Sequence, residues 1–277
     1  MSLSINTNVA SLNAQRNLSV SQSQLNKSMQ RLSSGLRINS ASDDSAGLSI
    51  SENLRGQIRS QSQATRNAND GVSMIQTAEG ALNETSAILI RMRELAQQSS
   101  TGTIGSTERG YIQNEFSKLT SEIDRISATT EFNGTQLLNG NISSSGVEFQ
   151  IGTRNTGNDR ISLSVGKMDS SSMGLGSSVK VDSAAGSQAA LTAIDTAIAS
   201  VSSTRGDLGA TQNRLQSTIN NLQVAMENTS SAESRIRDVD VASETAIMTR
   251  NNILTQAGTA ILSQANQSPQ LALKLLQ

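Results

Sequence analysis

The 277-residue chain contains no cysteine, no histidine and no tryptophan, and only one proline, one tyrosine and three phenylalanines. Without histidine or cysteine it has no Ser-His-Asp triad, no Cys-His pair, no thiolate nucleophile and no zinc finger. Catalysis would have to rest on carboxylates, lysine, tyrosine or a borrowed cofactor. The missing cysteine is compatible both with a reducing compartment and with export, so it does not identify the compartment.

Long apolar runs and an excess of one charge are also missing. No run of about 18 apolar residues occurs, so no membrane insertion is expected. The formal net charge of -1 argues against nucleic-acid binding, which favours basic patches with aromatic platforms. The first residues lack a basic segment followed by an apolar one, so no Sec signal peptide is expected.

Periodic apolar residues are what the chain does contain. Only 35% of its residues are hydrophobic and 1% aromatic, which is little material for a large compact core. A low net charge combined with strong periodicity argues against disorder and favours long helices. We therefore predict a mainly α fold, a long helical hairpin or coiled-coil rod with a small β-hairpin region between the N- and C-terminal helices.

Residues 1–44 and 235–277 are predicted to form two terminal arms that meet at one end of the rod. Their apolar residues recur at heptad spacing, which produces a narrow seam suited to one or two partner helices. Since repeated apolar residues stay exposed along so narrow a seam, we expect self-association. Pro269 is expected to break or restart the last helix. The predicted seam residues are Ile5, Val9, Leu12, Leu18, Leu25, Leu32, Ile247, Leu254 and Ile261.

The middle of the chain is predicted to consist of long helices. Residues 45–183 should hold two of them, the first from about residue 45 to 98 after the capping pair Asp43-Asp44. The second should run to about residue 129 from an N-cap at Ser106 or Thr107. Residues 184–234 should form one further long helix with a 3,4 apolar alternation.

A change of period marks the segment between these helices. Val147, Phe149 and Ile151 alternate with polar residues, and the same alternation returns over residues 161–165. A glycine- and asparagine-rich stretch separates the two runs. This pattern predicts a β-hairpin, which needs a neighbouring surface because two strands alone are marginally stable.

Several short motifs carry a family resemblance. In the N-terminal half they are LSSGLRIN (32–39), DDSAGL (43–48), QTAEGAL (76–82), MRELA (92–96) and FNG (132–134). In the C-terminal half they are LGATQNRL (208–215), AESRIRDVD (232–240) and QANQSPQ (264–270). In this order they resemble bacterial flagellin. Only residues 140–186 are generic, where larger flagellins insert outer domains, so the chain resembles a minimal, two-domain flagellin.

The resemblance implies a structural subunit of the bacterial flagellar filament, with the arms as the filament core. It implies export by the flagellar type III apparatus and a secreted, extracellular location. The implied partners are further copies of the chain, an export chaperone, the filament cap and hook-junction proteins, and no cofactor is implied.

The resemblance also implies a receptor surface. Flagellins recognised by Toll-like receptor 5 present an arginine, a leucine and a glutamate, and Arg91, Leu95 and Glu115 fall on the matching positions. Ile90 stands where a glutamine is usual. The alternative is that these residues serve packing and ion pairing between subunits.

Three further sequence features and several rival functions need a structural explanation. Asp238 and Asp240 resemble the start of a calcium loop, but the glycine and bidentate glutamate are missing, so no metal site is predicted. Asp43-Asp44 is expected to cap a helix rather than to act as a paired-carboxylate site. Tyr111 is expected to pack or to contact another subunit. The rival functions are a hook-filament junction protein, a secreted coiled-coil effector or receptor-binding module, and an enzyme that uses carboxylates.

Overall fold

The computed structural model describes residues 7–143 and 146–274, with side chains up to residue 267 near the C-terminal end. The fold is mainly α, as predicted. Contacts divide the chain into a terminal unit, Met1–Gly56 with Asn228–Gln277, and a middle unit, Gln57–Glu227. The division falls inside two long helices, whereas the predicted boundaries lie at residues 44 and 235.

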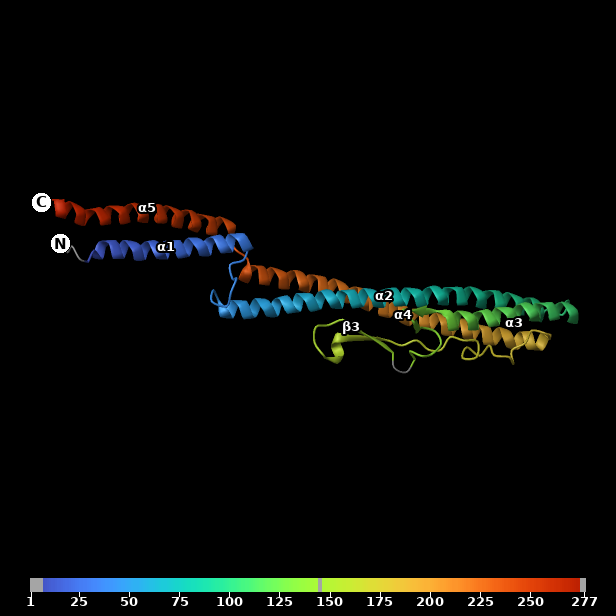
Figure 1. Ribbon diagram of the computed structural model, residues 1–277. Helices are drawn as coiled ribbons and strands as arrows, with labels where there is room; N and C mark the ends of the chain where they lie inside the picture. Colours follow the sequence, from blue (N-terminus) through green and yellow to red (C-terminus); the bar gives the residue numbers. More distant parts are fainter. Residues whose placement is uncertain (1–6, 144–145, 275–277) are drawn as a thin grey trace. The chain divides into compact units, whose positions relative to one another are not determined.

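Two helices from opposite ends of the chain lie side by side in the terminal unit (Figure 1). They are α1 (Val9–Ser34) and α5 (Val241–Lys274). The Asn8 side chain caps α1 by accepting the N–H of Ser11, and Gly35 ends the helix in the left-handed conformation at φ 73°. Asp240 caps α5 through the N–H groups of Ala242 and Ser243. Both ends therefore follow local capping chemistry.

The segments that leave α1 and enter α5 are paired with each other. Leu36 and Asp238 form an antiparallel β-bridge. The N–H of Arg37 donates to the carbonyl of Arg237 at 2.7 Å, and the N–H of Val239 donates to the carbonyl of Gly35 at 3.0 Å. These bonds hold the segment that follows α1 to the segment that precedes α5.

Three long helices run beside one another in the middle unit (Figure 1): α2 (Ser45–Ser100), α3 (Ser106–Thr129) and α4 (Ala184–Arg237). They share one apolar core. Its most deeply buried side chains include Ile75, Leu82, Leu89, Phe116, Ile123, Ile194, Leu208 and Leu215. Ion pairs join the helices at the surface, since Arg93 contacts Asp195 at 2.8 Å and Arg205 contacts Glu79 at 3.7 Å.

Two small antiparallel sheets complete the middle unit. The predicted hairpin is present as β3 (Val147–Gln150) and β4 (Arg160–Leu163), with a 3-10 turn, η1 (Gly157–Asp159), before β4. Phe149 pairs with Ile161 in its register, and both side chains are buried against the helices. The hairpin thus obtains the supporting surface that two strands need.

The other sheet was not predicted. β1 (Glu131–Phe132) pairs with β2 (Thr135–Gln136) around a two-residue turn. Asn133 and Gly134 adopt φ values of 49° and 78°, which suits the Asn-Gly turn of a tight hairpin.

Two predictions about helix ends were wrong. The N-cap of α3 is Gly105, not Ser106 or Thr107, and Glu108 occupies the first turn. Pro269 neither breaks nor restarts the last helix, because α5 runs through it to Lys274. A proline removes one helical hydrogen bond, and this long helix continues despite that loss.

Candidate assembly interface

Polar side chains are buried or paired where α1 meets α5. Ser28 of α1 is buried, and so are Glu244 and Asn251 of α5. Arg31, in the last turn of α1, forms an ion pair with Glu244 at 3.5 Å. A Cβ added at Gly258 would lie 3.3 Å from Leu18 Cδ1, the far end of a half-buried side chain, so Gly258 faces α1. These polar contacts fix how the two helices match but bury little apolar area.

Hydrogen bonds tie α1 and α5 together farther along the pair. The Asn8 amide donates to the carbonyl of Ala265 at 2.8 Å, and the Ser11 hydroxyl donates to Asn266 Oδ1 at 2.7 Å. Each of these hydrogen bonds replaces hydrogen bonds to water, so its net contribution to stability is small. Because each bond needs its two partners side by side, the bonds specify the register of α1 against α5.

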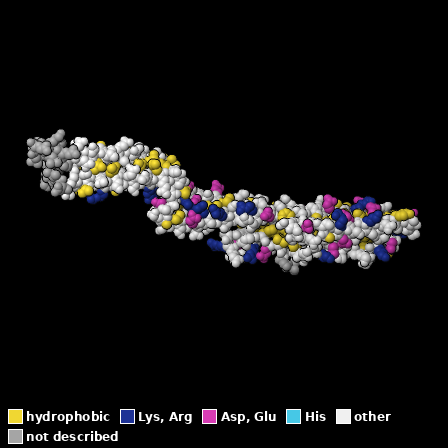
Figure 2. All heavy atoms as spheres, viewed as in Figure 1, with side chains coloured by type: hydrophobic (Ala, Val, Ile, Leu, Met, Phe, Trp, Pro, Cys, Tyr) yellow, Lys and Arg dark blue, Asp and Glu magenta, His cyan; other side chains and the backbone are white. Residues whose placement is uncertain are grey.

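Large apolar side chains on the same two helices remain exposed. They are between 39% and 61% exposed, and Figure 2 shows apolar side chains on the visible face of this helix pair. Such repeated exposure on long helices is typical of an interaction surface. The exposed residues are Val9, Leu12, Val20, Met29, Val241, Ile247, Ile253, Leu254 and Ile261.

The predicted seam is therefore divided. Leu18, Leu25 and Leu32 are half-buried on α1. The remaining described seam residues of both helices belong to the exposed set, and Ile5 lies outside the described residues. Whether this seam forms a filament core stays a prediction.

Two open grooves accompany the exposed residues. One, of about 670 Å³, lies along α5 between Ala242 and Leu254 and includes Ala246, Thr249 and Ile253. The other, of about 540 Å³, lies between α1 and α5, with Leu18 and Thr255 among its lining residues. Small side chains in such grooves allow another helix to approach closely.

A polar cluster holds the start of α2 to α1. Lys27 contacts Asp43 at 2.7 Å, and Asp43 also accepts the N–H groups of Asn39 and Ser40. The Lys27 ammonium, followed by these N–H groups, lowers the pKa of Asp43 to about 2 against the opposing effect of burial. Asp44 accepts the N–H of Gly47 at 2.9 Å and so caps α2, as predicted, whereas the ion pair of Asp43 was not predicted.

A second cationic cluster joins the end of α4 to α2 within the terminal unit. Arg237 contacts Glu52 at 2.7 Å, and the guanidinium of Arg37 donates to the carbonyl of Ile236 at 2.6 Å. The hydrogen bond from Arg237, together with one from Arg55, lowers the pKa of Glu52. Arg37 thereby satisfies a carbonyl at the end of α4 that has no helical partner.

The predicted receptor residues lie in the middle unit. Arg91 donates to Glu115 at 2.9 Å and to Glu94 at 3.0 Å, and all three side chains are largely exposed. The hydrogen bond that Arg91 donates to Glu115, followed by the one it donates to Glu94, raises the pKa of Arg91. Leu95 is only 2% exposed and belongs to the apolar core, so it does not share the surface of Arg91 and Glu115.

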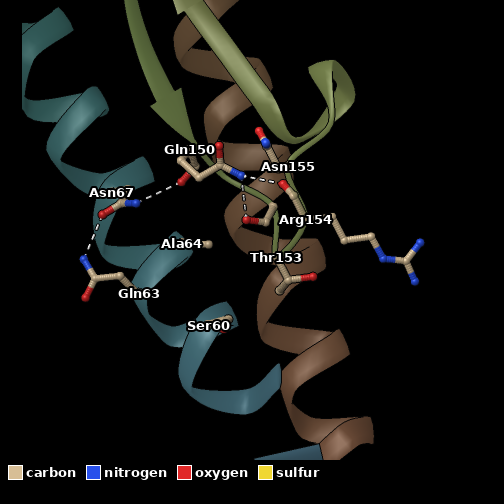
Figure 3. Close-up of a pocket in the computed structure, with 9 residues that line it drawn as sticks. Ser60, Gln63, Ala64, Asn67, Gln150, Thr153, Arg154 and Asn155 are labelled. Carbon is tan, nitrogen blue, oxygen red and sulfur yellow. Dashed lines mark hydrogen bonds between the residues drawn. The ribbon is translucent and has the colours of Figure 1, made fainter. Parts of the chain in front are cut away.

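The hairpin tip and α2 form a pocket of about 330 Å³ that is lined mostly by residues with polar side chains (Figure 3). Asn67 donates to the carbonyl of Gln150 at 2.9 Å, and the Gln150 amide donates to the carbonyls of Gly152 and Arg154. These bonds fix the tip. They occupy the amide groups that would otherwise be available to a ligand.

Comparison with known proteins identifies the family. Residues 5–143 match the bacterial flagellin N-terminal helical region, and residues 191–276 match the bacterial flagellin C-terminal helical region. The chain belongs to the bacterial flagellins. The predicted resemblance is confirmed.

Relatives of flagellin type match along nearly the whole chain. The chain is 48% identical to a flagellin of Halalkalibacterium halodurans and 48% identical to one of Bacillus subtilis, with 99% of each chain covered. It is 42% identical to the flagellar filament 33 kDa core protein of Treponema phagedenis, again with 99% of each covered. A crystal structure of Bacillus cereus flagellin shares 31% identity at a TM-score of 0.50, covering 57% of this chain and 88% of that one.

These findings establish what this flagellin does. It is a structural subunit of the flagellar filament, and it lacks a large outer domain. The full-length match to flagellins does not favour a hook-filament junction protein or a secreted effector. Over residues 7–143 and 146–274, no helix is long and apolar enough to cross a membrane, and no group of three potential metal ligands is found.

Proposed function

We propose that the exposed apolar faces of α1 and α5 are the surface through which copies of this flagellin pack together in the filament. One observation carries the proposal: large apolar side chains on both helices stay exposed although the helices already contact each other. Complete burial of a fully exposed Leu or Ile side chain contributes about 1.5–3 kcal/mol, and covering these partly exposed side chains contributes the remaining part of that. Several such residues per copy offset the entropy that association costs.

A double substitution on α5 tests this proposal. Ile253→Asp with Leu254→Asp places two carboxylates beside the 670 Å³ groove. Both native side chains are exposed, so the monomer should keep its circular dichroism melt, while filaments should be absent under the electron microscope. The control is Ser171→Asp, at an exposed loop of the middle unit, which should assemble normally. Filaments of normal length from the α5 variant would refute the proposal.

The finer assignments follow the family resemblance. We place the chain outside the cell, exported by the flagellar type III apparatus. An export chaperone, the filament cap and hook-junction proteins are its proposed partners. The role is structural rather than enzymatic, which agrees with a composition without histidine and cysteine.

A receptor contact is a second proposal. Arg91 and Glu115 form an exposed ion pair on adjacent helices, which suits recognition by Toll-like receptor 5 or contact with another subunit. If one surface serves both, the receptor should bind released subunits and not intact filaments. Binding assays on filaments and on depolymerised protein decide this, and equal affinity for both forms would contradict it. Leu95 would act there only by supporting the helix from the core.

A further inference from the structure

The single tyrosine of the chain is exposed at the surface. Tyr111 lies on α3 and is 69% exposed, the most exposed of the large apolar side chains described. Most of its surface is therefore left uncovered by its own chain. A tyrosine combines a large apolar ring with a hydroxyl donor, and such side chains often anchor interfaces.

A groove elsewhere in the middle unit has the complementary chemistry. It measures about 500 Å³ and lies where α2 meets the β1–β2 turn and β3. Its walls include Met74, Val147 and two of the three phenylalanines of the chain. The lining residues are Asp70, Met74, Phe132, Asn133, Thr135, Val147 and Phe149.

Asp70 provides the polar end of this groove. Its side chain is exposed, and it makes no ion pair with any residue of the described part of the chain. A carboxylate accepts a strong, short hydrogen bond from a hydroxyl. Apolar walls with one such acceptor suit the ring and hydroxyl of a tyrosine, since aromatic rings pack well against phenylalanine and methionine.

Tyr111 and this groove cannot meet within one chain. Tyr111 lies one helical turn from Glu115, which contacts Arg91. Asp70 precedes Arg91 on the same helix by about 30 Å, taking 1.5 Å per residue. A side chain spans only a fraction of that distance, so the ring could enter this groove only on another copy.

We propose that Tyr111 of one copy inserts into the Asp70 groove of a neighbouring copy, with its hydroxyl donating to the Asp70 carboxylate. The proposal rests on the filament function and adds a contact between middle units to the one proposed for α1 and α5. The Tyr111 side chain and the Asp70 groove are different surfaces of the molecule, so the contact is heterologous. Repetition of a heterologous contact builds an open helical polymer, as a filament requires.

Cross-linking tests the contact directly, because the chain has no native cysteine. One preparation carries Tyr111→Cys and another Thr135→Cys, at the edge of the groove. The two are copolymerised and treated with a short bis-maleimide. We expect a cross-linked dimer that needs both variants and disappears when filaments are depolymerised before treatment. The matched control replaces Tyr111→Cys by Val224→Cys, at another exposed apolar position of the middle unit, and should give no dimer.

Assembly measurements complete the test. Tyr111→Ala should raise the concentration needed for polymerisation by at least about tenfold, as for loss of an interface anchor, and Tyr111→Phe should have a smaller effect. In Tyr111→Phe, adding Asp70→Ala should cause little further change, because the hydrogen bond is already lost. Monomer melts should match the wild type.

The outcomes separate this contact from the filament function itself. Wild-type protein that forms no filaments would contradict the proposed assembly role. Filaments that form normally but give no more cross-linking than the Val224→Cys control would overturn the Tyr111 contact alone. Unchanged polymerisation of Tyr111→Ala would overturn it as well.

Discussion

The middle and terminal units cover their apolar side chains to different degrees. In the middle unit, core residues from α2, α3, α4 and both strands of the β3–β4 hairpin are buried. In the terminal unit, Ile38 is the only large apolar residue buried among the side chains that the structure describes. Burial supplies most of the free energy of folding, so the middle unit should be stable in a single copy. The terminal unit has less buried apolar area within one copy and relies more on polar contacts.

The strongest test of this contrast is a charge placed in the middle core. Leu215 is completely buried, and truncating such a leucine alone costs about 2–5 kcal/mol. Leu215→Asp adds a carboxylate without a partner, so we expect loss of the cooperative melt followed by circular dichroism. The matching terminal substitution, Ile261→Asp, changes a residue that is 60% exposed and should leave the monomer melt unchanged. Similar melts for Leu215→Asp and wild type would show that the core is misassigned.

A medium effect is expected from acid acting on the terminal unit. Lys27 lowers the pKa of Asp43 to about 2 from 3.8, so the folded protein binds this proton less readily than the unfolded chain. The stabilisation is therefore complete above pH 3.8 and is lost as the pH falls towards 2. Asp43→Asn should lower the melting temperature at pH 6 and have a much smaller effect near pH 2. Lys27→Met should reproduce this profile, and a constant difference across the range would contradict it.

The smallest expected effect comes from the same substitution, glycine to alanine, made once in each unit. Alanine is better than glycine inside a helix by about 1 kcal/mol. At Gly71 the new Cβ would lie 3.1 Å from Leu215 Cδ1 and 3.2 Å from Phe149 Cδ1, both in the packed core. Crowding there costs about 1–3 kcal/mol, so Gly71→Ala should lower the melting temperature slightly.

At Gly258 the same change should have the opposite sign. The new Cβ would lie 3.3 Å from Leu18 Cδ1, and this half-buried side chain has room to move. Gly258→Ala should therefore slow amide hydrogen exchange in α5. If alanine stabilised the protein at both positions, or destabilised it at both, the two units would not differ in packing as described.

Much of the fold could be predicted because periodicity reports helices and strands directly. The heptads of the arms, the 3,4 alternation of α4 and the period-two runs of β3 and β4 all lie where they were expected. The β1–β2 turn was missed although Asn133-Gly134 is a strong hairpin signal, because its strands are too short to show alternation. Pro269 was misread since a proline in a long helix does not always end it.

The interface was harder to predict than the helices. An apolar stripe shows which side of a helix seeks cover, but not which neighbour provides it. Leu18 and Leu254 belong to the same predicted seam, yet the first is half-buried and the second is 48% exposed. Leu95 similarly stands four residues after Arg91 but is buried in the core, because it continues the row of buried residues on α2 that includes Leu89. Only the packed structure separates these cases.

The pairing between residues 35–37 and 237–239 has a mechanical consequence. Backbone hydrogen bonds and the guanidinium of Arg37 tie the segment that leaves α1 to the segment that enters α5. A pull or twist applied to either terminal helix is therefore shared by both segments. A chain in a rotating filament would stretch the two connections together, and neither one would carry the load alone.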